Sequence, residues 1–163
     1  MHTNNFAMQL TRGADYGVRA MIHLATLSPR ERALLPELAA ATESPESFLS
    51  KVLQALAHAK LIESRRGKAG GFAILARGRA ASIYDVVEAI DGPIYLNTCL
   101  NPEEHCIRKA WCSAHPVWAE AQRAMLDVLK RSVIEDLAAQ SAGARALALP
   151  HAAPAPIEEL EVL

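Results

Sequence analysis

Apolar positions in the first part of the chain follow the spacing of an α-helix. Apolar and aromatic residues recur at intervals of four, four and three from Tyr16 to Leu27, which places them on one helical face. Thr11 is a favourable N-cap, and Pro29 ends the pattern. The spacing therefore predicts one amphipathic helix close to the start of the chain.

The next stretch, LPELAAATESPESFLSKVLQALAHAKLIES, contains two apolar patterns divided by a short polar joint. Pro36 in a first turn begins a short helix. A longer helix over about 45–59 is expected to begin with Ser44 as N-cap, Pro45 at the first helical position and Glu46 in the first turn. Two helices with so short a joint are typical of a helix-turn-helix, although the turn lacks the glycine often found there.

The following segment predicts a β-hairpin and then another helix. Strands at 61–64 and 72–75 flank the basic, glycine-bearing stretch RRGKAGG. Ser82 and Asp85 have the spacing of a capping box, and Gly92 followed by proline ends the helix that they open. Helix, helix-turn-helix and hairpin, in this order, predict a mainly α fold with a small β-hairpin wing, a winged helix-turn-helix.

A long amphipathic helix is predicted over 116–140. Its apolar stripe consists of Trp118, Ala121, Met125, Val128, Leu129, Val133 and Leu137. Such a stripe needs a partner surface, which is either the chain's own domain or a second copy of the chain, and we favour a dimer interface. From residue 141 onward the composition turns to alanine and proline with acidic residues at the end, which predicts a disordered tail.

Composition and charge narrow the class of protein. Only 5% of the 163 residues are aromatic, whereas 51% are hydrophobic, which favours helices packed through small and aliphatic side chains. The net charge is −1, but residues 60–79 hold six basic residues against one acidic residue. Because the chain shows no apolar run of membrane-spanning length and no secretion signal at its start, we expect a cytoplasmic protein with no membrane partner.

The helix-turn-helix and the basic hairpin predict binding to double-stranded DNA. The recognition helix would enter the major groove with its N-terminal residues facing the base edges. The side chains expected to reach DNA are Ser44, Ser47, Ser50 and Lys51 from this helix and Arg65, Arg66 and Lys68 from the hairpin. Phe48, Leu49, Val52 and Leu56 are expected to face the core. The alternatives are an ordinary solvated turn for the hairpin residues, and a winged helix that binds protein.

All three cysteines and a histidine fall within residues 99–115, CLNPEEHCIRKAWCSAH. The spacing of Cys99, Cys106, Cys112 and His115 is C-x6-C-x5-C-x2-H, in a polar stretch where packing cysteines are unusual. Clustered thiols in a reducing compartment favour metal ligation over disulfides. Structural zinc usually uses shorter C-x2-4-C spacings, so an iron–sulfur cluster with one non-cysteine ligand fits better, and zinc remains the alternative. No catalytic loop or substrate pocket supports a thiol enzyme with Cys106 or Cys112 as nucleophile, so we expect neither enzyme activity nor a small-molecule substrate.

Taken together, these segments resemble the iron–sulfur cluster-binding winged-helix regulators of the IscR and NsrR type. The matching stretches are LTRGADYGVRAMIHLA, LPELAAATESPESFLSKVLQAL, LIESRRGKAGGFAI, SIYDVVEAIDGP, the three-cysteine loop and HPVWAEAQRAML, in one order over residues 9–138. The resemblance implies a homodimeric transcription factor that holds a [2Fe-2S] or [4Fe-4S] cluster through its three cysteines, with the long helix as dimer interface. For the fourth ligand it implies either His115 or Asp15 from the partner subunit, and we lean to His115.

The resemblance also implies a domain layout and a mode of control. The expected segments are a disordered start at 1–8, a winged helix-turn-helix at 9–92, a cluster-binding loop at 93–115, a dimerisation helix at 116–140 and a disordered tail at 141–163. We expect a repressor whose DNA affinity changes when the cluster is lost, oxidised or nitrosylated. Lys68 and Ala69 stand where the wing of the family commonly has proline and glycine. Ser50 stands where family members that recognise an IscR-type site have an acidic residue, so the resemblance does not predict the operator sequence. The gap between Cys99 and Cys106 is one residue longer than the corresponding gap in IscR and NsrR, which leaves the cluster type open.

Overall fold

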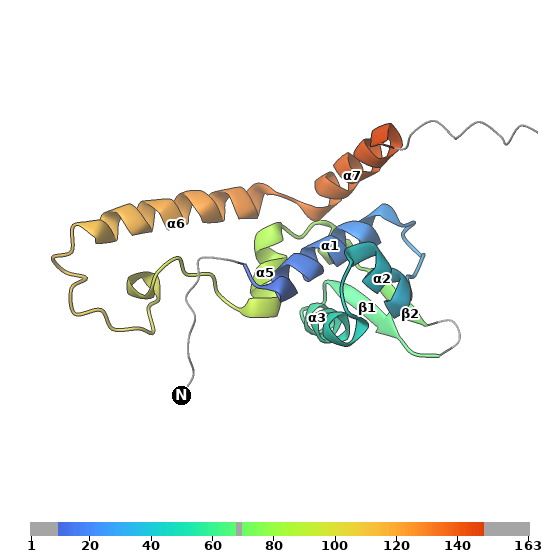
Figure 1. The fold of residues 1–163 in the computed structure, drawn as a ribbon, viewed down its shortest axis with the longest axis horizontal. Coiled ribbons are helices and arrows are strands. Elements are labelled where there is room, and N and C mark those ends of the chain that lie inside the picture. The colour runs from blue at the N-terminus through green and yellow to red at the C-terminus, as the bar shows by residue number, and fades with distance from the viewer. Residues whose placement is uncertain (1–9, 68–69, 149–163) are drawn as a thin grey trace, which may run out of the picture.

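The computed structural model describes residues 10–67 and 70–148 and is mainly helical with one two-stranded antiparallel sheet (Figure 1). The predicted fold class is thereby confirmed. The elements are α1 (Arg12–Thr26), α2 (Leu35–Thr42), α3 (Glu46–His58), β1 (Ile62–Arg65), β2 (Gly71–Ile74), α4 (Ala76–Arg79), α5 (Ile83–Asp91), the 3-10 helix η1 (Thr98–Leu100), α6 (Ala114–Arg131) and α7 (Ile134–Ala148). The predicted disordered start lies outside the described residues, as does the part of the predicted tail beyond residue 148.

Helix α1 runs through the centre of the winged-helix domain. Thr11 caps it as predicted, because its hydroxyl oxygen accepts a hydrogen bond from the Ala14 N–H at 3.1 Å. The same hydroxyl donates to the two carboxylate oxygens of Asp91 at 2.7 and 2.9 Å, which ties the start of α1 to the end of α5. Met21 of α1 is fully buried in one continuous core with side chains of α2, α3 and both strands.

The joint between α2 and α3 replaces the usual glycine with a strained residue. Glu43 adopts left-handed backbone angles of 53° and 42°, a conformation that costs a non-glycine residue roughly 1–2 kcal/mol. Around it, the buried Thr42 hydroxyl donates to the Leu38 carbonyl at 2.7 Å, and the Ser44 N–H donates to the Ala39 carbonyl at 3.0 Å. These local hydrogen bonds hold the turn in place although it has no glycine.

The predicted cap of α3 is wrong. The helix begins at Glu46, and Pro45, which has no side chain that could accept a hydrogen bond, occupies the N-cap position. The Ser44 hydroxyl instead forms a hydrogen bond with the Thr42 hydroxyl at 2.7 Å, within the turn. Ser44 therefore stabilises the joint between the helices rather than the first turn of α3.

The wing is a hairpin with a third chain segment beside it. Strands β1 and β2 pair with Glu63 opposite Ala73 and Arg65 opposite Gly71, and Phe72 forms two backbone hydrogen bonds with Ala33 at 2.9 and 3.0 Å. Gly71 has a φ of 112°, and a Cβ atom there would lie 2.7 Å from the Ala33 carbonyl oxygen. Only glycine therefore allows the chain before α2 to join the wing sheet.

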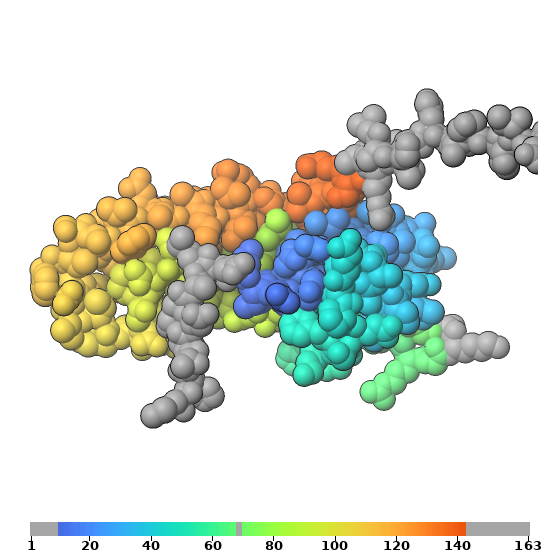
Figure 2. All heavy atoms as spheres, viewed as in Figure 1, coloured from blue at the N-terminus to red at the C-terminus, as the bar shows by residue number. Residues whose placement is uncertain are grey.

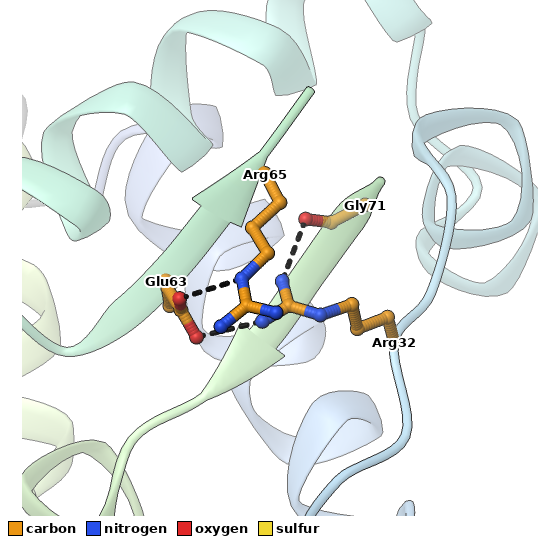
Figure 3. A network of polar contacts seen from close by, with 4 residues as sticks. All are labelled: Arg32, Glu63, Arg65 and Gly71. Atoms are coloured by element: carbon orange, nitrogen blue, oxygen red, sulfur yellow. Dashed lines mark hydrogen bonds and ion pairs between the residues drawn. The ribbon is translucent and has the colours of Figure 1, made fainter. Parts of the chain in front are cut away.

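A network of charges fixes the base of the wing (Figure 3). Arg32 donates to one carboxylate oxygen of Glu63 at 2.7 Å and to the Gly71 carbonyl at 3.3 Å, and Arg65 donates through Nε to the other Glu63 oxygen at 3.0 Å. The two guanidinium groups, Arg32 first, hold the pKa of Glu63 below its ordinary value of 4.5. Arg32 therefore joins the segment before α2 to both strands of the wing, through Glu63 on β1 and Gly71 on β2.

The predicted single helix over 116–140 is two helices in the structure. Helix α6 ends at Arg131, and α7 begins at Ile134 after an extended Ser132. The Ile83 N–H donates to the Ser132 carbonyl and the Ile134 N–H donates to the Ala81 carbonyl, both at 2.9 Å, so the chain pairs with the segment before α5 instead of continuing as a helix. Ile134 is buried in the domain core, and α7 continues through Ala148, where the sequence predicted a disordered tail from residue 141.

Helix α6 leaves the compact domain as an arm. Ser82 and Asp85 form the predicted capping box of α5, and the Lys130 ammonium group near the end of α6 lies 4.7 Å from the centre of the Tyr84 ring on α5. From there α6 and the loop 93–113 extend away from the wing, as the orange and yellow atoms in Figure 2 show. In the described part of the chain, no helix is both long and apolar enough to cross a membrane.

Gly78 on α4 gives a first test of the packing. A Cβ atom there would overlap the Leu61 carbonyl oxygen, a backbone atom that cannot turn away. Gly78→Ala should therefore lower the free energy of unfolding by about 1–3 kcal/mol, although alanine has the higher helix propensity by about 1 kcal/mol. Chemical denaturation measures the change, with Arg77→Ala on the exposed side of the same helix as a control; a stabilised Gly78→Ala would contradict this packing.

The Glu63 network gives a test with a pH dependence. A carboxylate whose pKa is lowered by folding stabilises the folded state above its unfolded pKa, and this contribution is lost as the pH falls through the folded value. Glu63→Gln should therefore lower Tm at pH 7, and wild type and variant should converge as the pH falls below about 4. Thermal unfolding across this range measures the difference, with Glu103→Gln in the exposed loop as control. A Tm difference that stays constant with pH would show that the carboxylate charge is not its source.

Candidate DNA interface and cysteine centre

Helix α3 presents a polar face to solvent and an apolar face to the core. Leu49, Val52 and Leu56 are at most 5% exposed, as predicted. Ser47 and Lys51 are exposed and Ser50 is half-buried, and their spacing of three and four residues puts them on one face. This face is free to approach the major groove of DNA.

Two residues of α3 differ from their predicted positions. Phe48 was expected in the core but is 43% exposed, and it packs edge-on against the Tyr16 ring at 5.8 Å. Gln54 was not singled out from the sequence, yet it is exposed one turn after Ser50 and Lys51. Its amide can form paired hydrogen bonds with adenine, and the spacing of three and four residues was the signal that could have found it.

The wing places Arg65 and Arg66 at its exposed end. Arg65 contacts Glu63 only through Nε, and among the described residues its two terminal nitrogens have no hydrogen-bond partner. Glu63 therefore holds the side chain without consuming the donors that would meet a phosphate. Lys68, the third predicted contact of the wing, lies outside the described residues.

The three cysteines converge on one cavity of about 380 Å³ at the start of α6. Cys99 lies on η1, Cys106 in the loop and Cys112 just before α6, and all three are half-buried free thiols. His115, in the first turn of α6, lines the same cavity, and its Nδ1 lies 3.5 Å from the Cys99 sulfur. The sequence-predicted donors from three separate segments are thus brought to one place.

The cavity also contains donors and charges that the spacing did not single out. His105 lines it beside Cys106 and adds a second imidazole. Arg108 and Lys109 line it as well, and their positive charges would offset the negative charge of thiolate ligands. Proximity in the loop was the only signal for these residues, since none of them belongs to the C-x6-C-x5-C-x2-H pattern.

The donor set suits a thiolate-ligated metal group, although it is not arranged for one. Three sulfurs and an imidazole are the ligands of zinc Cys3His sites and of iron–sulfur clusters with one histidine. Within the described residues, no three Cys, His, Asp or Glu side chains stand close enough together to form a metal site. The chemistry of the cavity therefore fits the group, and the loop 99–115 would have to close around it.

Asp15, the other candidate for the fourth ligand, lies on α1 and does not line the cysteine cavity of its own chain. Its carboxylate forms an ion pair with Arg19 at 2.9 Å, and both side chains are about half exposed. Arg19 in turn donates to the Thr42 carbonyl at 3.4 Å, at the end of α2. Asp15 is thereby connected to the turn that precedes α3.

Helix α6 has no buried residue in the single chain. Val117, Trp118 and Val128 are 61%, 38% and 45% exposed, and the loop adds Ile107 and Trp111 at 78% and 72%. The large apolar side chains of this helix are therefore partly uncovered, whereas α7 packs against α1 through Ile134 and Ala138, which the predicted stripe did not include. Exposed apolar side chains gathered on one helix and its adjoining loop usually indicate an interaction surface.

Known proteins that are similar in sequence to this chain include transcriptional regulators. Residues 10–140 match the family model of Rrf2, described as an iron-dependent transcriptional regulator. The chain is 30% identical over 131 residues to the HTH-type transcriptional regulator NsrR of Bacillus licheniformis, covering 80% of this chain and 92% of the relative. It is 27% identical to CymR of Bacillus subtilis over 136 residues, covering 83% and 94% of the two chains.

Solved structures show the same architecture. CymR, the global cysteine regulator of B. subtilis, superposes with a TM-score of 0.65 at 26% identity, covering 81% of this chain and 97% of CymR. IscR of T. potens superposes with a TM-score of 0.66 at 20% identity, covering 84% and 90%, which supports the fold.

The family consists of transcriptional regulators that bind DNA and not of enzymes, in agreement with the polar face of α3 and the basic wing. With the match covering the winged helix, the cysteine loop and the arm, the chain belongs to the Rrf2 family of transcriptional regulators.

Proposed function

We propose that this protein is a homodimeric repressor whose affinity for DNA is controlled by an iron–sulfur cluster. Cys99, Cys106 and Cys112 would hold the cluster, with His115 as the fourth ligand. The observation that carries the proposal is the convergence of these four side chains on one cavity, with the His115 ring nitrogen 3.5 Å from the Cys99 sulfur. The iron-dependent description of the family supports it.

The exposed face of α6 supports a homodimer. A helix of 18 residues with no buried side chain would gain free energy by covering its apolar row, at about 25 cal/mol for each Å² of apolar surface removed from water. A second copy of the chain supplies an identical row, which is the self-complementary surface that a two-fold dimer uses. Two recognition helices α3 would then face two half-sites about one helical turn of DNA apart.

The start of α6 connects the cysteine cavity to this dimer. In one chain the cysteine loop lies at the opposite end of the molecule from the wing (Figure 1), so the loop cannot act on its own wing by direct contact. Cys112 and His115 flank the first residue of α6, so ligation through them would fix the beginning of the dimerisation helix. When bound, a cluster supplies a centre that is oxidised, nitrosylated or lost in response to oxygen or superoxide, nitric oxide or iron scarcity. Release of Cys112 and His115 would free this end of α6 and change the placement of the two α3 helices.

Asp15 of the partner subunit offers a different connection if it is the fourth ligand. Ligation would withdraw its carboxylate from Arg19, which also donates to the Thr42 carbonyl in the turn before α3. The signal would then reach the recognition helix through Arg19 rather than through α6. Structural zinc in the same cavity is the second candidate for the metal, because three thiolates and one imidazole also form a complete tetrahedral zinc site.

The metal content tests the cluster. Protein purified without oxygen should be coloured and contain iron together with acid-labile sulfide, and Cys106→Ala should lose most of both because one of three thiolate ligands is gone. Ser113→Ala, a comparable change beside Cys112, should retain them. A colourless wild-type protein with one equivalent of zinc would overturn the sensor and support the structural site. Comparing the visible spectra of His115→Ala and Asp15→Ala then identifies the fourth ligand, because the variant that loses a ligand should shift the absorption bands more.

The salt dependence of binding tests the contribution of the wing. For each phosphate neutralised, the logarithm of the binding constant falls with the logarithm of salt concentration by a slope of about 0.9. Arg66→Ala should weaken binding to all sequences and reduce this slope by about 0.9. Arg77→Ala removes the same charge from α4 and should leave the slope unchanged. Fluorescence anisotropy on a labelled duplex at several salt concentrations gives both values, and an unaltered slope for Arg66→Ala would exclude the wing from the interface.

A further inference from the structure

The face of the wing sheet that is turned away from the core carries an unusual concentration of arginine. The strand register puts Glu63 and Arg65 on this face and Ile62 and Phe72 on the other, where they pack with the core that includes α3. Arg32 joins the first face because its neighbour Ala33 pairs with Phe72. The arginine-bearing face is therefore separated from the recognition helix by the sheet itself.

A cavity of about 600 Å³ lies against this face, and we call it the arginine cavity. Its charged walls are Arg30, Arg32, Arg65, Arg79 and Glu63. Pro29, Ala73 and Leu75 contribute apolar surface to the same cavity. Its volume falls within the roughly 300–1,000 Å³ of pockets that take small organic ligands, and it combines apolar walls with a few converging charged groups as such pockets do.

The charges that line the arginine cavity do not balance. Four guanidinium groups share one lining carboxylate, and Glu63 is already divided between Arg32 and Arg65. Arg79, only 18% exposed, donates to the Ala25 and Leu27 carbonyls at 2.8 Å, and these neutral acceptors do not neutralise its charge. Its nearest carboxylate, that of Glu135, is 4.0 Å away and largely exposed. The cavity therefore keeps an excess of positive charge beside partly buried side chains, where screening by water is weak.

We propose that the arginine cavity binds a small organic dianion, a phosphate monoester in its best-fitting form. Guanidinium forks match the oxygen atoms of phosphate in pairs, and the apolar walls would cover the organic part of the ligand. A phosphate would bind the terminal nitrogens of Arg65, which Glu63 leaves free, and its negative charge would repel the Glu63 carboxylate beside it. Occupancy would therefore loosen the network that joins Arg32, Glu63 and Arg65 and would alter how the wing presents Arg65 to DNA. This site is independent of the cysteine centre and lies on the opposite face of the sheet from α3.

Calorimetric titration of the full-length protein, free of DNA, with phenyl phosphate tests the site. We expect saturable binding of one molecule per chain with a dissociation constant of about 1 mM or below. Arg30→Glu reverses a charge at the cavity without breaking a hydrogen bond that shapes the fold, and should weaken binding at least about tenfold. Arg77→Glu, the same change on the outer side of α4, should leave the dissociation constant within about twofold because that residue does not line the cavity.

Three outcomes would overturn the proposal. Absence of saturable heat from wild-type protein, or equal weakening by Arg30→Glu and Arg77→Glu, would leave only general attraction to a basic surface. Phenol binding as tightly as phenyl phosphate would make the cavity an apolar pocket. Since all titrations use DNA-free protein and need no metal, their failure leaves the cluster proposal untouched.

Discussion

Two backbone hydrogen bonds at the end of α6 determine where the C-terminal half of the molecule lies. Pairing of Ser132 and Ile134 with the segment before α5 stops the helix and turns the chain back onto α1. Ile134 then enters the core, so α7 becomes part of the winged-helix domain. Helix α6 is paired with the domain near this end, and Gln122 in its middle accepts a hydrogen bond from the Leu96 N–H. The helix extends from the domain and carries the cysteine loop at its other end.

A second set of contacts, at the base of the wing, fixes the position of the hairpin in the winged-helix domain. Gly71 lets the segment before α2 join the hairpin, and Glu63 connects that segment to Arg65. The hairpin is consequently tied to the domain through charges and backbone pairing as well as through the apolar face of its two short strands. Because the pKa of Glu63 lies below its ordinary value, the carboxylate stays charged and the connection persists throughout the neutral range.

The sequence predicted those elements that depend on local spacing. The Thr11 cap, the Ser82 capping box and the apolar face of α3 follow from residues three or four positions apart, and the structure has them, apart from the exposed Phe48 of α3. It could not predict the break at Ser132, because that depends on backbone partners about fifty residues away. Ser44 is misleading for a different reason, since its hydroxyl bonds that of Thr42, only two residues away, instead of capping α3. For the candidate site, the cysteine spacing indicated the donors, while their arrangement around a cavity and the loop closure that a metal would require depend on packing that no local pattern encodes.

The geometry of α6 makes it a lever. Its 18 residues span about 27 Å at 1.5 Å per residue, and the domain holds it near one end through the Ser132 pairing and the Lys130–Tyr84 contact. A rotation of about 5° at that joint would move the far end by about 2 Å, comparable to the helix shifts that accompany regulated changes at protein interfaces. Conversely, a displacement of that size in the cysteine loop becomes a small turn of the whole domain. The arm thus converts a displacement of the cysteine loop into a rotation of the domain. This rotation sets the relative angle of the two recognition helices, which must match the two half-sites of one DNA duplex.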